Sequence, residues 1–213
     1  MLNLSFSRLI SLAMILLISF PVHELAHAYM ADYFGDDTPR LHGRLTLNPL
    51  AHLEFFGALS MLLVGFGWAK PVPISEYALS RRSRYAPAIV ALAGPTSNLI
   101  LAILAGILLS TGLFTLPQTT GGVLPSMYEL LYMFTLFNFV LFFFNLIPLF
   151  PLDGEKIALS LLPYEWSVRL ESLRRFTYGP LLILIWVLPV IGIPILSWLI
   201  FNPSQWLTRL FTG

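Results

Sequence analysis

The sequence predicts an all-α polytopic membrane protein with about four full transmembrane helices, a short re-entrant or half-spanning segment and small β-segments. Two features carry this prediction. Of the 213 residues, 57% are hydrophobic and only 11% are charged, whereas an ordinary soluble domain carries about 25% charged residues. The uncharged stretches are also long, because residues 86–128 and 130–152 contain no Asp, Glu, Lys, Arg or His. A chain of this composition is expected to be an integral, multi-pass membrane protein.

Charge and cysteine content exclude several other classes of protein. Twelve basic and eleven acidic residues leave a net charge of +1, which gives no electrostatic reason to expect nucleic acid as a partner. The chain contains no cysteine, so a disulfide scaffold, a thiol nucleophile and a cysteine-ligated metal site are excluded. The expected surroundings are the lipid bilayer and other membrane proteins.

Four stretches are long enough to be full spans, because a spanning helix needs about 20 apolar residues. They are predicted at roughly 5–32, 87–113, 127–150 and 178–200. The segment 55–68 is apolar but shorter, and it contains three glycines. Such a segment is predicted to be re-entrant or to reach half-way across, packed inside the bundle.

Small β-segments are predicted at 44–47 and 70–74, close to the first span. Residues 44–47 alternate between polar and apolar side chains, which is the period of a strand. Four nearby prolines, at positions 39, 49, 71 and 73, exclude the interior of a helix.

The basic residues predict the orientation of the chain in the membrane. Ten of the twelve lie in two regions, residues 40–84 and 156–175, whereas the loop near 114–126 has none. Short basic loops stay in the cytoplasm. The N-terminus is therefore predicted to lie outside, and both basic regions inside the cell.

The first predicted span carries the sequence His23-Glu24-Leu25-Ala26-His27. Ionisable residues inside a bilayer are costly and are functional candidates by default. Residues i and i+4 share one face of a helix, so both imidazoles can point at one metal ion. Glu24 lies about 100° around the helix from His23 and can accept a proton from water without being a ligand. The motif predicts a metal site with Glu24 as catalytic general base.

Two histidines leave a catalytic zinc site one protein ligand short. Asp153 is one candidate, because it follows 23 uncharged residues in a segment that two prolines and a glycine would unwind. Glu129 is a rival, although the predicted topology places it at the opposite side of the membrane. His42 and His52, both in the polar loop after the first span, are the other candidates.

Five spaced motifs together resemble the site-2 protease family of intramembrane zinc metalloproteases. They cover residues 20–154, nearly two thirds of the chain, and read His23-Glu24-Leu25-Ala26-His27, Asn48-Pro49-Leu50-Ala51-His52, Gly67-Trp68-Ala69-Lys70-Pro71-Val72-Pro73, Ala93-Gly94-Pro95-Thr96-Ser97-Asn98 and Asn145 to Asp153-Gly154. The resemblance implies one zinc ion per chain, held by His23, His27 and Asp153. It implies that Glu24 activates water and that Asn145 contacts the substrate backbone or the oxyanion.

On this interpretation, the chain hydrolyses a peptide bond in or near a transmembrane helix of a single-span membrane protein. His52 is a second candidate donor to the oxyanion, and an unwound substrate strand could pair with the edges near 44–47 or 70–74. The chain is expected to form a single membrane-embedded domain, residues 1–213, in a prokaryotic cell membrane, with the active site opening to the cytoplasm. Its core is expected at about 20–154, and 155–213 are expected to form a cytoplasmic amphipathic helix and the last span. No stretch has the length of an inserted PDZ or CBS domain.

The sequence departs from the family pattern at two places. Glu54 and its neighbours replace an Asp-Pro-x-Gly sequence after His52, and Glu155 stands where a glycine often follows Asp-Gly. Two other functions compete with a protease. A catalytically silent homologue would hold membrane proteins without cutting them, although silencing usually costs one of the metal-site residues. A metal or solute transporter would be expected to show repeated or inverted halves, and the sequence shows no repeat.

Overall fold

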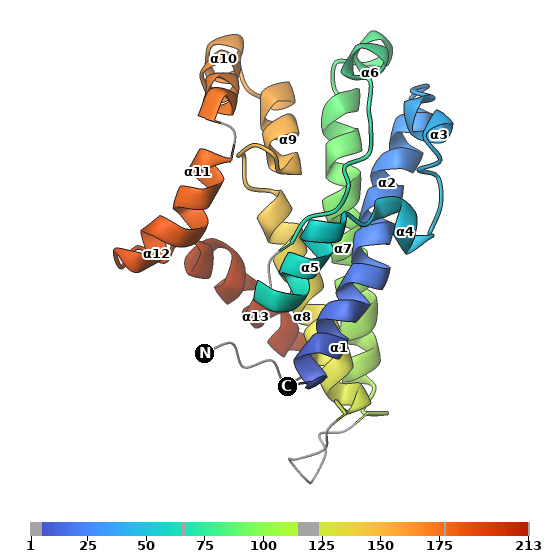
Figure 1. Cartoon of the computed structure of the whole chain (residues 1–213), viewed down its shortest axis with the longest axis vertical. Helices are drawn as coiled ribbons and strands as arrows, with labels where there is room; N and C mark the ends of the chain where they lie inside the picture. Colours follow the sequence, from blue (N-terminus) through green and yellow to red (C-terminus); the bar gives the residue numbers. More distant parts are fainter. Residues whose placement is uncertain (1–5, 65–66, 115–123, 177, 213) are drawn as a thin grey trace.

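The computed structural model describes residues 6–64, 67–114, 124–176 and 178–212. These residues are mainly helical and, among them, none belongs to a β-strand (Figure 1). The predicted β-segments at 44–47 and 70–74 are therefore wrong. A single isolated bridge pairs Leu53 with Ala69. No ladder extends it, because Pro71 and Pro73 have no N–H and because the carbonyls of Lys70 and Pro71 accept from the Arg44 guanidinium at 3.1 and 3.2 Å.

The first span is built from α1 (Phe6–Met14), a short π-helical segment (Ile15–Ser19) and α2 (Phe20–Tyr33). Pro21 cannot donate a backbone hydrogen bond, and a local π-turn just before it is a common way to absorb that loss. The apolar helix runs from Leu9 to Tyr33, as the sequence predicted. The start of the predicted span at residue 5 lies outside the described residues.

The next two spans are α7 (Ala86–Ser110) and α8 (Met127–Asn145). They pack against one another, α7 also packs against α2, and α8 packs against α1, so that the three spans lie side by side (Figure 1). Both helices start where the sequence predicted. Each ends a few residues earlier than predicted, α8 at Asn145, because the prolines at 148 and 151 cannot continue a helix. The loop residues 115–123 lie outside the described part of the chain.

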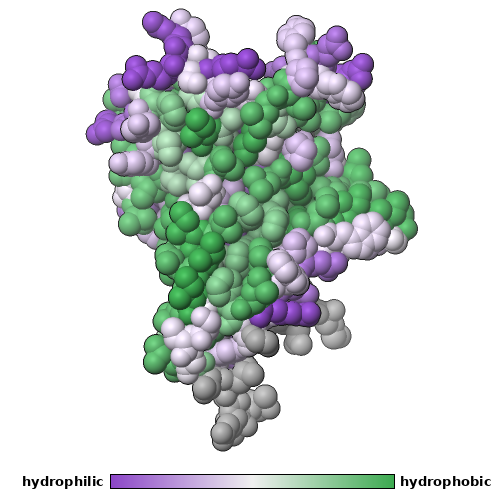
Figure 2. All heavy atoms as spheres, turned by 180° about the vertical axis from the view of Figure 1, so that it is seen from behind, coloured by the Kyte–Doolittle hydropathy of each residue, from purple (hydrophilic) through white to green (hydrophobic). Residues whose placement is uncertain are grey.

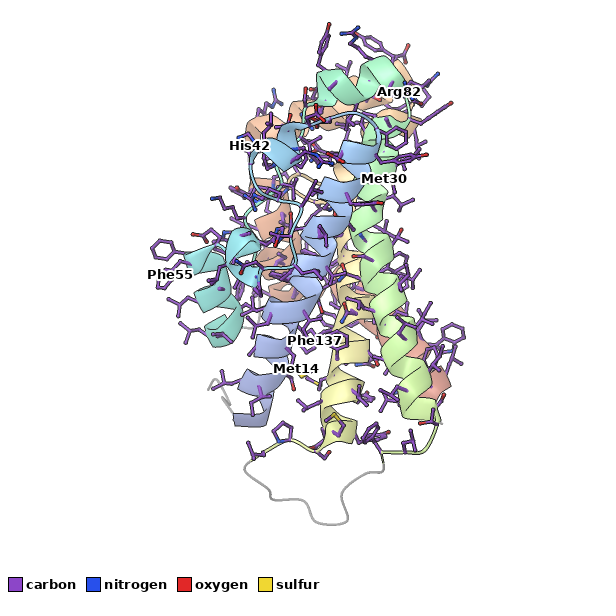
Figure 3. All side chains as sticks on the ribbon, turned by 90° about the vertical axis from the view of Figure 1, so that its right-hand side faces the viewer. Met14, Met30, His42, Phe55, Arg82 and Phe137 are labelled. Carbon is purple, nitrogen blue, oxygen red and sulfur yellow. The ribbon has the colours of Figure 1, made fainter. Side chains whose placement is uncertain are left out.

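The short apolar segment forms α5 (Phe55–Val64). Ten helical residues extend about 15 Å, half the thickness of a bilayer core, so α5 does not cross it. Its Met61 packs in a buried cluster with Leu12, Ile15, Leu16 and Phe20 of the first span. Phe55 points away from the bundle (Figure 3). The antiparallel bridge between Leu53 and Ala69 brings the chain back to the start of α5, so the segment is re-entrant, one of the two predicted alternatives; residues 65 and 66 lie outside the described residues.

Besides α5, three short helices lie between the first span and α7 in the described part of the chain: α3 (Thr38–Leu41), α4 (Pro49–His52) and α6 (Glu76–Arg82). After α8 the chain forms α9 (Asp153–Leu161), α10 (Tyr164–Ser172) and a 3₁₀ turn at Leu173–Phe176. Helix α10 lies in the region for which the sequence predicted a cytoplasmic amphipathic helix.

The predicted fourth span at 178–200 is not one continuous helix. A helical stretch made of α11 (Gly179–Leu182), a π-helical segment (Ile183–Val187) and α12 (Leu188–Val190) comes first, and it ends at a turn. Gly192 has a φ of 84° there, a conformation that favours glycine. A third π-helical segment (Ser197–Phe201) and α13 (Asn202–Thr212) follow. Among the described residues three helices are long and apolar enough to cross a membrane, or four if the pair Tyr164–Phe176 and Gly179–Val190, bent by 80°, forms one span.

Polar residues gather at one end of the molecule. Helices α3, α6 and α10 lie together at that end (Figure 1), and each carries arginines. Figure 2 shows hydrophilic residues at this end and an apolar belt below it. The two basic regions therefore face the same side, which is the arrangement that the charge pattern predicted.

Candidate metal centre

Two helices that are far apart in the sequence bring three ligand-type side chains together. His23 and His27 extend from one face of α2, one turn apart, and Asp153 is the first residue of α9. The Oδ2 atom of Asp153 lies 3.2 Å from the Nε2 atom of each histidine. The two Nε2 atoms lie 3.0 Å from one another. This is the arrangement expected when one cation is bound by all three atoms.

Helix α7 holds the other nitrogen of each imidazole. His27 Nδ1 lies 2.7 Å from the backbone carbonyl oxygen of Val90. His23 Nδ1 lies 2.6 Å from the Oδ1 atom of Asn98. Because the Val90 carbonyl can only accept, His27 Nδ1 must donate, and the Nε2 atom of a neutral His27 then presents a lone pair.

The tautomer of His23 follows from a chain of hydrogen bonds that ends on α8. The Phe134 carbonyl can only accept, so the Nδ2 atom of Asn138, at 2.8 Å, donates to it. The Oδ1 atom of Asn138 therefore accepts from Asn98 Nδ2 at 3.0 Å. The Oδ1 atom of Asn98 then faces His23 Nδ1, which must donate. A neutral His23 thus also presents its Nε2 lone pair to the centre.

Three electron-pair donors therefore face one another in a nearly closed space. Both histidines are buried. The Oδ2 atom of Asp153 is buried and has no hydrogen-bond partner. A buried acceptor without a donor costs about 1–3 kcal/mol or more, and a cation removes that cost for all three atoms. The donor set of two imidazoles and one carboxylate fits a catalytic zinc ion, which keeps one position open.

Gly94 allows α7 to approach the two histidines. A Cβ atom at this position would collide with the imidazole rings of both His27 and His23. Any residue with a side chain would therefore push α7 away from α2 or turn the rings. Gly94 is required here for close contact rather than for an unusual backbone conformation.

The chain between α8 and α9 brings Asp153 to the histidines. Leu146 to Leu152 are not helical, because Pro148 and Pro151 cannot continue α8. Gly154 lies so close to the backbone carbonyls of Leu146 and Ile147 that a Cβ atom would collide with them. The Asp153-Gly154 pair is thus held against the end of α8, on the side of α7 and α2.

The metal centre opens into a cavity of about 850 Å³ with a mainly apolar lining. Its walls come from α2, α7 and α8, from residues 67–79, and from residues 178–201. Charged residues, histidines and amides in the lining are His23, Glu24, His27, Glu76, Asn98, Asn145, Asp153 and Lys156. Glu24 and Asn145 thus face the same space as the three ligand-type residues.

The other candidate residues have different surroundings. His52 is fully buried, and its Nε2 atom lies 2.8 Å from the Thr46 carbonyl oxygen. It is not among the residues that line the cavity. The Oε2 atom of Glu129 caps the start of α8 by accepting from Ser126 N at 2.8 Å, at the end of α8 opposite to Asn145. His42 is exposed and bonds the Thr38 carbonyl, near the polar end of the molecule (Figure 3).

Asn98 and Asn138 support the metal centre, although neither was predicted to have a role there. Both side chains are fully buried, and both lie in predicted spans. An amide inside an apolar span is costly unless it is paired. This signal was available in the sequence and would have suggested that the two asparagines support a polar site.

Replacing Asn98 by leucine is expected to lower metal affinity by about 10–100-fold, the usual cost of losing a residue that orients a ligand. The imidazole of His23 would lose the acceptor of its Nδ1–H. Competition with a chelator, monitored for the detergent-purified protein, measures this affinity. Ser110→Ala, at the far end of α7, removes only a bond to the Ile107 carbonyl and serves as control. Unchanged metal affinity in Asn98→Leu would contradict the orienting role.

Comparisons with known proteins identify relatives that are named as zinc metalloproteases. The family model "Peptidase family M50" matches residues 111–184. The chain is 40% identical over 198 residues to a Bacillus subtilis protein named "Putative zinc metalloprotease YwhC", covering 91% of this chain and 87% of that protein. It is 31% identical over 197 residues to "Putative zinc metalloprotease Rip2" of Mycobacterium tuberculosis H37Rv, covering 90% of this chain and 70% of that protein. No solved structure matches the chain.

Proposed function

The chain belongs to peptidase family M50, and from that premise we propose that it is an intramembrane zinc metalloendopeptidase. It hydrolyses a peptide bond in or near a transmembrane helix of another membrane protein. One observation carries the proposal. The Nε2 atoms of His23 and His27 and the Oδ2 atom of Asp153 converge, and Glu24 lines the cavity that opens beside them.

His23, His27 and Asp153 are the residues that would hold the zinc ion. A bound zinc ion supplies Lewis-acid polarisation of water and of the peptide carbonyl group. In the protein, both imidazoles present Nε2 lone pairs to the zinc position, because His27 Nδ1 donates to the Val90 carbonyl and His23 Nδ1 donates to Asn98 Oδ1. Because these rings are fixed in orientation before binding, the site does not have to reorganise.

Glu24 is assigned the transfer of protons. It follows His23 directly, so its side chain leaves α2 about 100° away from the ligand face. It lines the cavity, where it can accept a proton from the attacking water and pass it to the leaving amine. Its carboxylate is not one of the three grouped ligand atoms.

We assign to Asn145 a hydrogen bond to the carbonyl oxygen of the scissile peptide group. Its amide group has two N–H donors. One of them bonds the Leu141 carbonyl at 3.1 Å, which fixes the orientation of the side chain at the end of α8. The second N–H can donate to the oxygen of the scissile peptide group, where negative charge develops.

The cavity is suited to bind an apolar segment of a substrate. Its lining is mainly apolar, and one of its walls is formed by residues 178–201. A peptide bond inside a helix must be unwound before its carbonyl group can be attacked, so the expected substrate is a single-span membrane protein whose helix unwinds readily. We place the polar end of the molecule in the cytoplasm, because short basic loops stay there.

The test is cleavage of a panel of single-span membrane proteins by the purified full chain in detergent or vesicles. Mass spectrometry of the products locates the cut. Wild-type protein is expected to cut within or beside the span, and Asp153→Ala to lose both its metal and its cleavage. Metal binding by the wild type without cleavage of any substrate would favour the catalytically silent homologue instead.

A further inference from the structure

A buried ion pair lies next to the proposed zinc ligand Asp153. Glu155 follows two residues later, and only 2% of its surface is exposed. The guanidinium group of Arg174 bonds both of its carboxylate oxygens, Nε to Oε1 at 2.7 Å and Nη2 to Oε2 at 3.2 Å. Bidentate pairs of this kind combine charge with a fixed geometry.

The pair and the metal centre act on opposite sides of one short helix. Successive residues of a helix are separated by about 100°, so Asp153 and Glu155 leave α9 about 200° apart. Asp153 faces the histidines of α2, and Glu155 faces the turn that carries Arg174. Rotation of α9 about its axis would therefore displace both side chains together. The ion pair opposes that rotation.

Arg174 belongs to a part of the chain that has few other anchors. Neither α10 nor the turn Leu173–Phe176 contains a buried residue. Helix α10 packs against α9, where the Ser167 hydroxyl also donates to the Leu159 carbonyl at 3.1 Å. Shortly after Arg174, residues 178–201 form one wall of the cavity. The pair thus joins the helix that bears Asp153 to the start of that wall.

We propose that Glu155 and Arg174 are positioning residues, which hold Asp153 in the orientation for metal binding and fix the wall of residues 178–201 against the catalytic core. The proposed effect on metal binding follows from the geometry of α9 alone. The proposed effect on substrate binding rests on the proposed function. The carboxylate of Glu155 bonds neither histidine and is not one of the grouped ligand atoms, so it acts through the helix that it shares with Asp153.

Single and paired substitutions separate positioning from simple stability. Removing one partner of a buried pair leaves an uncompensated charge, whereas replacing both with apolar residues often restores stability. The variants are therefore Glu155→Gln, Arg174→Gln and the double variant Glu155→Met with Arg174→Met. The matched control is Arg175→Gln, which removes an exposed neighbouring guanidinium that lies over the Phe176 ring.

Metal affinity is measured with zinc against a chelator, and ligand geometry by the absorption spectrum of the cobalt-loaded protein. Both single variants and the double variant are expected to bind zinc about tenfold more weakly, the lower end of the range for residues that support a ligand, and to show a changed cobalt spectrum. The control is expected to match the wild type. A double variant that is as stable as wild type and binds zinc with wild-type affinity and spectrum would overturn the proposal.

Cleavage assays test the substrate part separately. In the zinc-saturated variants, KM for a single-span substrate is expected to rise, because the cavity wall is less firmly held. An unchanged KM would overturn this part. If the wild-type protein binds zinc but cleaves nothing, the proposed function fails, while the metal affinities of the variants still decide the positioning role.

Discussion

Glu24→Gln is expected to abolish detectable peptide hydrolysis while the protein keeps its metal. The amide has nearly the shape of the carboxylate but cannot accept a proton from water. General-base catalysis contributes about 10²–10⁴-fold to rates, so a loss of this size is expected. The metal stays, because His23, His27 and Asp153 supply the three grouped ligand atoms.

The measurement is kcat/KM for a single-span substrate together with zinc content in the same preparation. Glu76→Gln is the matched control, since it makes the same substitution at another carboxylate of the same cavity. It is expected to keep wild-type zinc content and to cleave the substrate. If Glu24→Gln cleaves the substrate with the same kcat/KM as the wild type, Glu24 is not the general base. Loss of zinc from this variant would show instead that Glu24 is a ligand.

Gly94→Ala is expected to disrupt the metal centre from a position that carries no polar group. The added methyl group would collide with the rings of His27 and His23. Accommodating it would separate α7 from α2 or turn the imidazoles away from Val90 and Asn98. Overpacking of this kind costs about 1–3 kcal/mol, and metal affinity is expected to fall by about 100-fold, the upper end of the range for residues that support a ligand.

Zinc affinity and thermal unfolding of the detergent-purified protein measure the two effects. Gly179→Ala is the control, because a Cβ atom there would lie 3.6 Å from its nearest neighbour, the Phe176 Cβ, which is ordinary contact. That variant is expected to match the wild type in zinc affinity. If Gly94→Ala binds zinc as tightly as the wild type, the close approach of α7 is not required for the site.

The spans and the histidine motif could be predicted because their signals are local. The length of an apolar run predicts a span directly, and Leu9–Tyr33, Ala86–Ser110 and Met127–Asn145 follow those runs closely. The four-residue spacing of His23 and His27 predicts a shared helix face in the same way. The break in the segment 178–200 also has a local signal, since Gly192 lies between Pro189 and Pro194. The uninterrupted run of apolar residues nevertheless favoured the prediction of one continuous span.

Long-range contacts could not be predicted from local patterns. The side chain of Arg44 bonds carbonyls 26 and 27 residues away, and this occupies two backbone acceptors of the predicted β-segment at 70–74. The amide chain that fixes His23 joins residues separated by 75 and 40 positions. The Glu155–Arg174 pair spans 19 residues. In each case a polar side chain finds a partner that only the packed bundle brings near.

Removal and return of the metal tests the central claim most directly. Zinc content and cleavage of a single-span substrate are measured together in the purified full chain before chelation, after chelation and after zinc is added back. One zinc ion per chain is expected, with cleavage that falls in proportion to the zinc removed and returns when zinc is restored. Cleavage that persists in fully metal-free protein would contradict catalysis at the His23, His27 and Asp153 site.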